Sequence, residues 1–296
     1  MNTQSSRPVV VGYDGSAAGD SALSWAAREA ARRNATLHVV VATGVPFATA
    51  PGFGAAWPWP DDLDDALLTQ AKERLGDSTE GIPVVTESTI GTPASVLVEA
   101  SKWAEIVVVG RRRHTVIGEF VGGSTSAQVA AHAACPVVVV EDGKPGAPDG
   151  QIIVGVDGSE PNESAIALAF DWASSVGAPV VLVHAWALDV PVSFEAAQLS
   201  QAIVEEVEER QRVFLDETVL AWSAKYPEVD VRSVLSRDRT VPAMLAEAKG
   251  AQLLVVGSRG HGGFVGLLLG SVSQGLIHHE RPCPLVVVHA EQVGSR

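Results

Sequence analysis

A run of glycines late in the chain has the residue types and the spacing of a phosphate-binding loop. Gly257 is followed after two residues by Gly260, and the pair Gly270-Ser271 comes nine residues further on. Glycine permits positive φ and lets backbone amides approach a ligand closely, while the start of a helix adds unpaired N–H groups and the positive end of its dipole. The pattern therefore predicts a cradle for a phosphate group, with Ser271 as the cap of the helix that follows.

A carboxylate stands at the start of the same half of the chain. Asp157 follows the apolar run 152–156 in the sequence Asp-Gly-Ser. In a doubly wound α/β sheet, ligands bind beyond the carboxyl ends of the strands, so we expect Asp157 to share one cleft with the glycines. An Asp-Gly-Ser sequence also closes turns through hydrogen bonds to its own backbone, and this structural alternative stays open.

The chain carries nearly the same sequence twice. Asp14 stands in the same Asp-Gly-Ser context 143 residues before Asp157, and Cys135 and Cys283, which are 148 residues apart, each precede a proline and an apolar strand. Each half is therefore expected to be a complete structural unit. Because both cysteines come just before a strand, we expect them to be small buried core residues rather than partners in a disulfide.

The pattern within each half predicts an α/β fold. Continuous apolar runs, typical of strands buried on both faces, alternate with segments of helical periodicity. We therefore expect two tandem doubly wound domains, each a five-stranded parallel sheet with helices on both faces. The expected domains cover residues 1–143 and 151–296, joined by a linker rich in Gly and Pro over 144–150. The expected strands are 9–12, 36–42, 83–89, 106–109 and 137–140, then 152–156, 179–184, 230–235, 253–256 and 285–289; the expected helices are 19–33, 61–75, 93–103 and 124–132, then 163–175, 194–225, 241–249 and 271–279.

Three features have structural interpretations beside functional ones. The acidic run 205–209 is interpreted as the solvated face of a long helix, with Leu199, Ile203 and Val207 pointing inward. The segment 44–60, rich in Pro and Gly, is either a lid or contact loop or a disordered excursion. Five histidines lack metal-ligand spacing and are expected to be structural or surface residues: His184, His261, His278, His279 and His289.

With these motifs the sequence resembles the universal stress protein family in its tandem two-domain form. ATP-binding members carry glycine, two residues, glycine, nine residues, glycine and then serine or threonine, which this chain matches from Gly257 to Ser271. The resemblance implies that Asp157 lies beside the adenosine of ATP, that the main chain near Ala185 contacts the adenine, and that the glycine loop holds the phosphates. The ligand-binding residues expected in the second half are Asp157, Ala185, Gly257, Arg259, Gly260, Gly270, Ser271, Val272 and Ser273; Arg259 either pairs with phosphate or is solvated.

The first half departs from this pattern at one glycine. Arg113, within the sequence Arg111-Arg-Arg-His114, stands where the second half has Gly260. If position 113 requires positive φ, arginine costs on the order of 1 kcal/mol of strain, and its side chain would also fill the phosphate space. Alternatively, the three arginines offset the lost amide contact by charge. The ligand-binding residues of the first half would be Asp14, Ala42, Gly110, Gly123 and Ser124.

Composition and charge exclude some classes of protein. The formal net charge of −14 repels polyanions and disfavours nucleic acid as a partner. No stretch approaches the roughly 18 apolar residues of a membrane span. The first residues contain no apolar signal segment, so we expect a cytoplasmic protein.

Three hypotheses about function follow. The first is a nucleotide-dependent regulator in stress or growth control, whose ATP occupancy biases its conformation or its contacts with an unknown protein partner. The second is an enzyme, a slow Mg²⁺-dependent ATP hydrolase, and the third is a partner-binding module without nucleotide. The first is favoured because the P-loop lysine is missing and no Ser-His-Asp or Cys-His set is visible.

The resemblance also implies a homodimer, formed through exposed last strands at 137–140 and 285–289.

Overall fold

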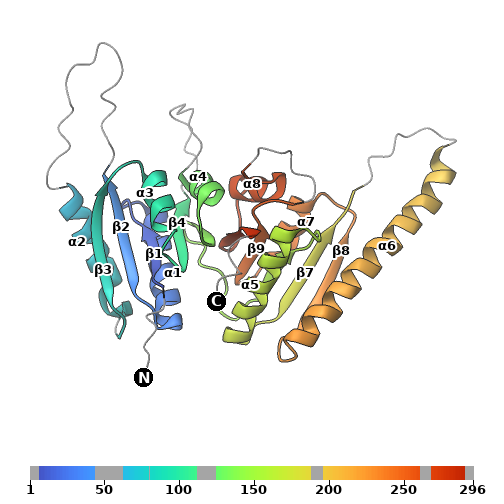
Figure 1. The fold of residues 1–296 in the computed structure, drawn as a ribbon, viewed down its shortest axis with the longest axis horizontal. Coiled ribbons are helices and arrows are strands. Elements are labelled where there is room, and N and C mark those ends of the chain that lie inside the picture. Colours follow the sequence, from blue (N-terminus) through green and yellow to red (C-terminus); the bar gives the residue numbers. More distant parts are fainter. Residues whose placement is uncertain are drawn as a thin grey trace, which may run out of the picture. The chain divides into compact units, whose positions relative to one another are not determined.

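The computed structural model describes residues 7–43, 63–79, 81–111, 125–187, 196–260 and 268–290. Contacts divide the chain into two compact units, Met1–Pro145 with Pro284–Val287, and Gly146–Cys283 with Val288–Arg296. Each unit alternates strands with helices (Figure 1). The α/β class expected from the sequence is therefore found in both halves, while the segment 44–60 lies outside the described residues.

Five parallel strands form the sheet of the first unit, in the order β3-β2-β1-β4-β5. The order reverses at β1, where Val9 lies opposite Leu37 of β2 on one side and Ile106 of β4 on the other. The elements are β1 (Val9–Gly12), α1 (Ala17–Arg33), β2 (Leu37–Thr43), α2 (Leu63–Leu75), a 3-10 turn (Gly76–Thr79), β3 (Val84–Ile90), α3 (Pro93–Ala100), β4 (Ile106–Arg111), α4 (Thr125–His132) and β5 (Val137–Glu141).

The second unit repeats this arrangement with the parallel order β9-β6-β7-β8. The strand order reverses at β6, where Ile152 lies opposite Val180 of β7 and Leu253 of β9. In a doubly wound sheet this reversal opens a crevice at the carboxyl ends of the strands. The elements are β6 (Ile152–Gly155), α5 (Glu160–Val176), β7 (Val180–Ala185), α6 (Ala196–Lys225), β8 (Val231–Ser236), α7 (Thr240–Glu247), β9 (Leu253–Gly257), α8 (Ser271–His278) and β10 (Leu285–Val288).

The central strands are buried on both faces. Ile152, Ile153 and Val154 of β6 are each 0% exposed, and Val9 to Val11 of β1 are the same. Successive residues of a strand point to opposite faces of the sheet, so helices must cover both faces. The doubly wound architecture expected from the apolar runs is therefore confirmed.

The last strand of the chain belongs mostly to the first unit. Residues 284–287 are grouped with that unit, and Leu285 and Val287 lie opposite Val139 and Val137 in an antiparallel pairing with β5. The expectation that both last strands are exposed is therefore wrong, because β5 has β4 on one side and β10 on the other. Five parallel strands are found in the first unit, and the four strands β9-β6-β7-β8 pair in parallel within the second.

The two cysteines lie in the core, as expected. Cys135 and Cys283 are 4% and 0% exposed, and neither forms a disulfide. Burial raises the pKa of the Cys135 thiol to about 12, because the low-dielectric surroundings disfavour the thiolate. A thiol that stays protonated at neutral pH is a poor nucleophile, so Cys135 acts as a small apolar residue.

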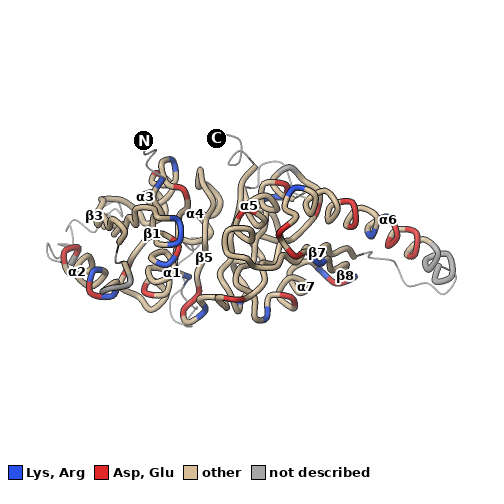
Figure 2. Tube along the Cα trace, turned by 90° about the horizontal axis from the view of Figure 1, so that it is seen from below, with Lys and Arg blue, Asp and Glu red and all other residues tan. Residues whose placement is uncertain are grey.

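The long helix α6 carries its acidic residues toward solvent, but its apolar face differs from expectation. Figure 2 shows acidic positions spaced along the helix, and Glu206 pairs with Arg210 at 2.6 Å. Ile203 is 52% exposed, so its expected inward orientation is wrong; Leu215 and Trp222 are the buried apolar residues of this helix.

Among the described residues, no helix has the combination of length and apolar character that a membrane crossing needs.

Candidate functional site

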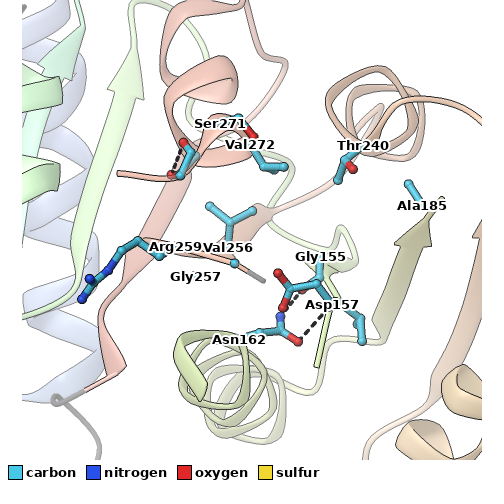
Figure 3. A pocket seen from close by; sticks show the side chains of 14 residues that line it. Gly155, Asp157, Asn162, Ala185, Thr240, Val256, Gly257, Arg259, Ser271 and Val272 are labelled. Atoms are coloured by element: carbon cyan, nitrogen blue, oxygen red, sulfur yellow. Dashed lines mark hydrogen bonds between the residues drawn. The ribbon is translucent and has the colours of Figure 1, made fainter. Parts of the chain in front are cut away.

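One cavity of about 210 Å³ lies at the carboxyl ends of the strands in the second unit (Figure 3). Its walls come from the segments that follow β6, β7, β8 and β9. All nine residues expected for the second half line it: Asp157, Ala185, Gly257, Arg259, Gly260, Gly270, Ser271, Val272 and Ser273. The structure therefore brings the carboxylate and the glycine run together, as the topology predicted.

The two carboxylate oxygens of Asp157 have different surroundings. Oδ1 accepts hydrogen bonds from the amide of Ser159 at 2.9 Å and from its hydroxyl at 2.7 Å. Oδ2 has no hydrogen-bond donor within the described part of the chain and lies against Gly260. The turn-closing interpretation of Asp-Gly-Ser therefore applies to Oδ1, and Oδ2 is the oxygen that a ligand could contact.

Asn162, a residue of α5, binds the main chain of the Asp-Gly-Ser turn. Its Oδ1 accepts from the amides of Asp157 at 3.0 Å and Gly158 at 3.2 Å, and its Nδ2 donates to the carbonyl of Gly155. The residue is 3% exposed and lines the cavity. Sequence reasoning missed it, although an asparagine just after a strand-to-helix turn commonly binds the amides of that turn.

The glycines are required for close approach and not for backbone conformation. None of Gly257, Gly260 and Gly270 has a positive φ, so of the two properties of glycine considered from the sequence only close approach applies. A Cβ at position 260 would collide with the carboxylate of Asp157, and one at position 257 would lie 3.0 Å from the main chain of Pro161. Gly260 therefore makes room for Asp157, and Gly257 makes room for α5.

The helix α8 begins at the cavity without a side-chain cap. Its N-cap is Gly270, with φ −74° and ψ 163°, so Ser271 is the first helical residue and not the cap that we expected. The amides of Ser271 and Val272 have no acceptor within the described part of the chain. Unpaired amides and the positive end of the helix dipole together favour an anion at this point.

Ser273 connects the start of α8 to the loop after β9 through its hydroxyl group. Its hydroxyl donates to the carbonyls of Ser258 at 2.9 Å and Gly270 at 3.0 Å, and the residue is 1% exposed. The amide of Gly270 also donates to the Ser258 carbonyl at 2.7 Å. These bonds hold α8 against the loop after β9, so the Ser273 hydroxyl is engaged within the protein.

The opposite wall combines the end of β7 with the start of α7. Ala185 is the last residue of β7, and Thr240, the first residue of α7, lies between Val272 and Ala185 in Figure 3. The N-cap of α7, Arg239, makes no side-chain cap hydrogen bond, so a second uncapped helix begins here. Besides Asn162 and Thr240, the lining residues that sequence reasoning missed are Gly155, Val156 and Val256. Most of them could be found by asking which residues follow each strand at its carboxyl end.

Arg259 is exposed, and its side chain points away from Asp157 and Ser271 (Figure 3). It forms no ion pair with the described residues. This placement favours the solvated alternative over a phosphate contact. The ionisable residues in the described wall of the cavity are Asp157 and Arg259, and only Asp157 faces inward.

The first unit forms the same turn with the same Asp and Ser side chains, but with a glycine where the second unit has Asn162. Asp14 Oδ1 accepts from the amide of Ser16 at 3.0 Å and from its hydroxyl at 2.6 Å. Gly19 occupies the position that corresponds to Asn162, and its amide donates to Ser16 Oγ at 3.1 Å, which caps α1. Ala42 lies in β2 opposite Thr89.

The arginine sequence of the first unit is partly used in the core. Gly110 is needed for packing, because a Cβ there would lie 2.6 Å from the carbonyl oxygen of Ala18. Arg111 pairs with Glu141, which is 0% exposed, so one of the three arginines is held within the fold. Two residues of the expected first-half site lie outside the described residues, Gly123 and Ser124, and so does Arg113.

The histidines that the structure describes include one in the core of the second unit. His184 contacts the carbonyl of Val156 through Nδ1 at 2.6 Å and Gln211 Oε1 through Nε2 at 2.8 Å, which confirms its structural interpretation. His261 lies outside the described residues. Over the described ranges, no three His, Cys, Asp or Glu side chains gather as they would around a metal ion.

One protein family matches the chain over both halves. The model of the Universal stress protein family matches residues 5–141 and 150–289. A universal stress protein of Mycobacterium tuberculosis is 36% identical over 289 residues, covering 94% of this chain and 96% of the relative. One from Mycolicibacterium smegmatis is 36% identical over 292 residues, covering 95% and 96%. A solved universal stress protein structure from Archaeoglobus fulgidus has a TM-score of 0.63 and 18% identity, covering 97% of this chain and 99% of that one, and shares the fold.

Proposed function

Because this chain belongs to the universal stress protein family, we propose that its second unit binds ATP and that the bound nucleotide regulates contacts with a protein partner. In this role the protein is a binding regulator in stress or growth control. Nucleotide occupancy would act by favouring one conformation over another, to the extent that ATP binds that conformation more tightly.

The proposal depends on one observation, the pairing of an anion-binding end with a hydrogen-bond acceptor in one cavity. The amides of Ser271 and Val272 suit a phosphate group, because they are unpaired and stand at the positive end of a helix dipole. Asp157 Oδ2 suits a hydroxyl or amino group of a nucleoside, since a carboxylate oxygen accepts hydrogen bonds. Ala185 lines the same cavity, and its main chain would meet the base.

The residues present also fit Mg²⁺ as a companion of the phosphates. Mg²⁺ prefers oxygen ligands and is commonly held by one or two carboxylates together with substrate phosphates. Asp157 Oδ2 would then bind the ion in place of the nucleoside group, and the ion would neutralise charge on the phosphates. Asp157 holds its own position through the bonds of Oδ1 to Ser159.

We further propose that ATP binds more tightly to the second unit than to the first. In the first unit, Ser16 caps α1 and Thr92 caps α3 with a side-chain oxygen, at 3.1 Å and 3.2 Å from the capped amides. The corresponding Ser159 and Arg239 make no side-chain cap bond in the second unit. Arg111 is also held in an ion pair with Glu141. We therefore expect the first unit to offer fewer hydrogen-bond donors to a phosphate group than the second.

Extraction of nucleotide from the native protein tests this function. The purified chain is denatured by heat, and the supernatant is analysed by anion exchange and mass spectrometry. ATP, or AMP as its product, is expected at about one molecule per chain. A supernatant without nucleotide, from protein that also fails to bind added ATP, would overturn the proposal and favour a partner-binding module.

The inward-facing carboxylate of Asp157 favours a second candidate, a slow Mg²⁺-dependent ATP hydrolase. A carboxylate beside a phosphate can accept a proton from an attacking water molecule. Phosphate release that disappears in Asp157→Ala would support this activity. Equal release by the two proteins would refute it.

A homodimer remains a proposal, formed through a surface other than the paired strands β5 and β10. The mass of one chain is 30.9 kDa. Sedimentation at twice that mass would support the dimer, and sedimentation at the mass of one chain would refute it.

A further inference from the structure

We propose that Asn162 is a positioning residue for the ligand site, which sets the place of the Asp157 carboxylate. The proposal rests on the nucleotide function proposed above, because its consequence for binding needs a ligand that contacts Asp157. Asn162 acts on the ligand through Asp157, and its effect on the turn itself exists without any ligand.

The side chain of Asn162 connects three backbone groups that otherwise belong to two elements. A primary amide can accept two hydrogen bonds and donate two. Here Oδ1 accepts from the amides of Asp157 and Gly158, at 3.0 Å and 3.2 Å, and Nδ2 donates to the carbonyl of Gly155 at the end of β6. At 3% exposure the residue leaves little access for water to replace these bonds. Asn162 therefore fixes the path of the chain from the strand into the turn.

These hydrogen bonds leave one oxygen of Asp157 available to a ligand and restrict the movement of its side chain. Asn162 holds its amide, and Ser159 holds Oδ1 through two bonds at 2.9 Å and 2.7 Å. Oδ2 is then fixed against Gly260, which also lines the cavity. A group held in its bound position before the ligand arrives loses less entropy on binding, which raises affinity.

Among its described residues, the first unit has no counterpart to this arrangement. Gly19 stands at the position that corresponds to Asn162, five residues after the aspartate. A Cβ at position 19 would lie 2.6 Å from Asp14 Oδ1, so the local geometry there excludes a side chain. The positioning contact is therefore a second difference between the units, independent of the change from Gly260 to Arg113.

The first test measures the turn itself in the full chain without ligand. Amide hydrogen exchange at Asp157 and Gly158 is followed by NMR in wild type and Asn162→Ala, with Glu163→Gln as the control, because Glu163 is exposed in the same helical turn. Asn162→Ala is expected to speed exchange of both amides by roughly tenfold, the order set by loss of one hydrogen bond, and Glu163→Gln to leave it unchanged. Unchanged exchange in Asn162→Ala would overturn the proposal. If that variant does not fold, Asn162→Ser replaces it with the same expectation.

The second test uses ATP as the probe in a double-mutant cycle. Calorimetry gives the affinities of wild type, Asn162→Ala, Asp157→Ala and the double variant, while thermal unfolding verifies that each is folded. Compared with wild type, Asn162→Ala is expected to bind ATP roughly tenfold more weakly. Compared with Asp157→Ala, the double variant is expected to differ in affinity by no more than about twofold. The same factor in both backgrounds would refute action through Asp157. If wild type does not bind ATP, the proposed function fails, and the exchange experiment alone decides the role of Asn162.

Discussion

Replacement of Gly260 by alanine tests whether this glycine is present to make room for Asp157. The added Cβ would overlap with Asp157 Oδ2, whereas the φ of Gly260 is not positive and adds no backbone strain. The carboxylate could move aside only by straining its bonds to Ser159, and it would then leave the position in which ATP is expected to contact it. Overpacking of this kind costs about 1–3 kcal/mol. Because about 1.4 kcal/mol corresponds to a factor of ten, the affinity for ATP should fall by roughly five- to a hundredfold.

Calorimetric titration with ATP, together with thermal unfolding, measures this effect. Gly177→Ala is the matched control, because Gly177 caps α5 with a φ of +70° and a Cβ there would meet no atom within 4 Å. The control should lose about 1–2 kcal/mol of stability through left-handed strain and keep its affinity for ATP. Wild-type affinity in Gly260→Ala would refute the reasoning, and so would an equal loss of affinity in Gly177→Ala.

Three further predictions concern the stability of the first unit, each measured by urea unfolding. Gly110→Ala should destabilise the protein by about 2–3 kcal/mol, because its Cβ would lie 2.6 Å from the Ala18 carbonyl oxygen; a loss below about 0.5 kcal/mol would contradict this. Arg111→Ala should cost about 3 kcal/mol by leaving buried Glu141 without this partner, and adding Glu141→Gln should recover part of the loss. For Cys135, burial raises the pKa from 9.0 to about 12 in the folded protein, so its stabilising effect is complete below pH 9 and is lost as the pH rises toward 12. The stability difference between wild type and Cys135→Ala should therefore be constant below pH 9 and shrink above it; a constant difference at all pH values would refute this.

The fold could be predicted from the sequence because strands buried on both faces are continuous runs of apolar residues. The run 253–256, for example, is expected as a strand and found as Leu253–Gly257. The pairing of β5 with β10 could not be predicted in this way, since an apolar strand does not reveal which partner covers its edge. Ile203 was misplaced because the first turns of α6 reach beyond the ends of β7 and β8 (Figure 1), where helical periodicity alone does not show what lies beneath.

The site could be predicted only as far as spacing along the chain records it. The glycine run and Asp157 carry the signal themselves, and the cavity brings them together. The reason for Gly260 was not visible, because its neighbour is Asp157, more than a hundred residues earlier in the chain. Asn162 and Thr240 were missed because asparagine and threonine are ordinary at helix starts, and only the geometry shows that these two face a cavity.

The stoichiometry of ATP binding to the full chain tests the central claim most directly. Calorimetric titration of wild type should give one tight site per chain, and Gly260→Glu should abolish it, since the new side chain and its negative charge would enter the space beside Asp157 and the start of α8. Two equal sites in wild type, or unchanged binding by Gly260→Glu, would contradict the account.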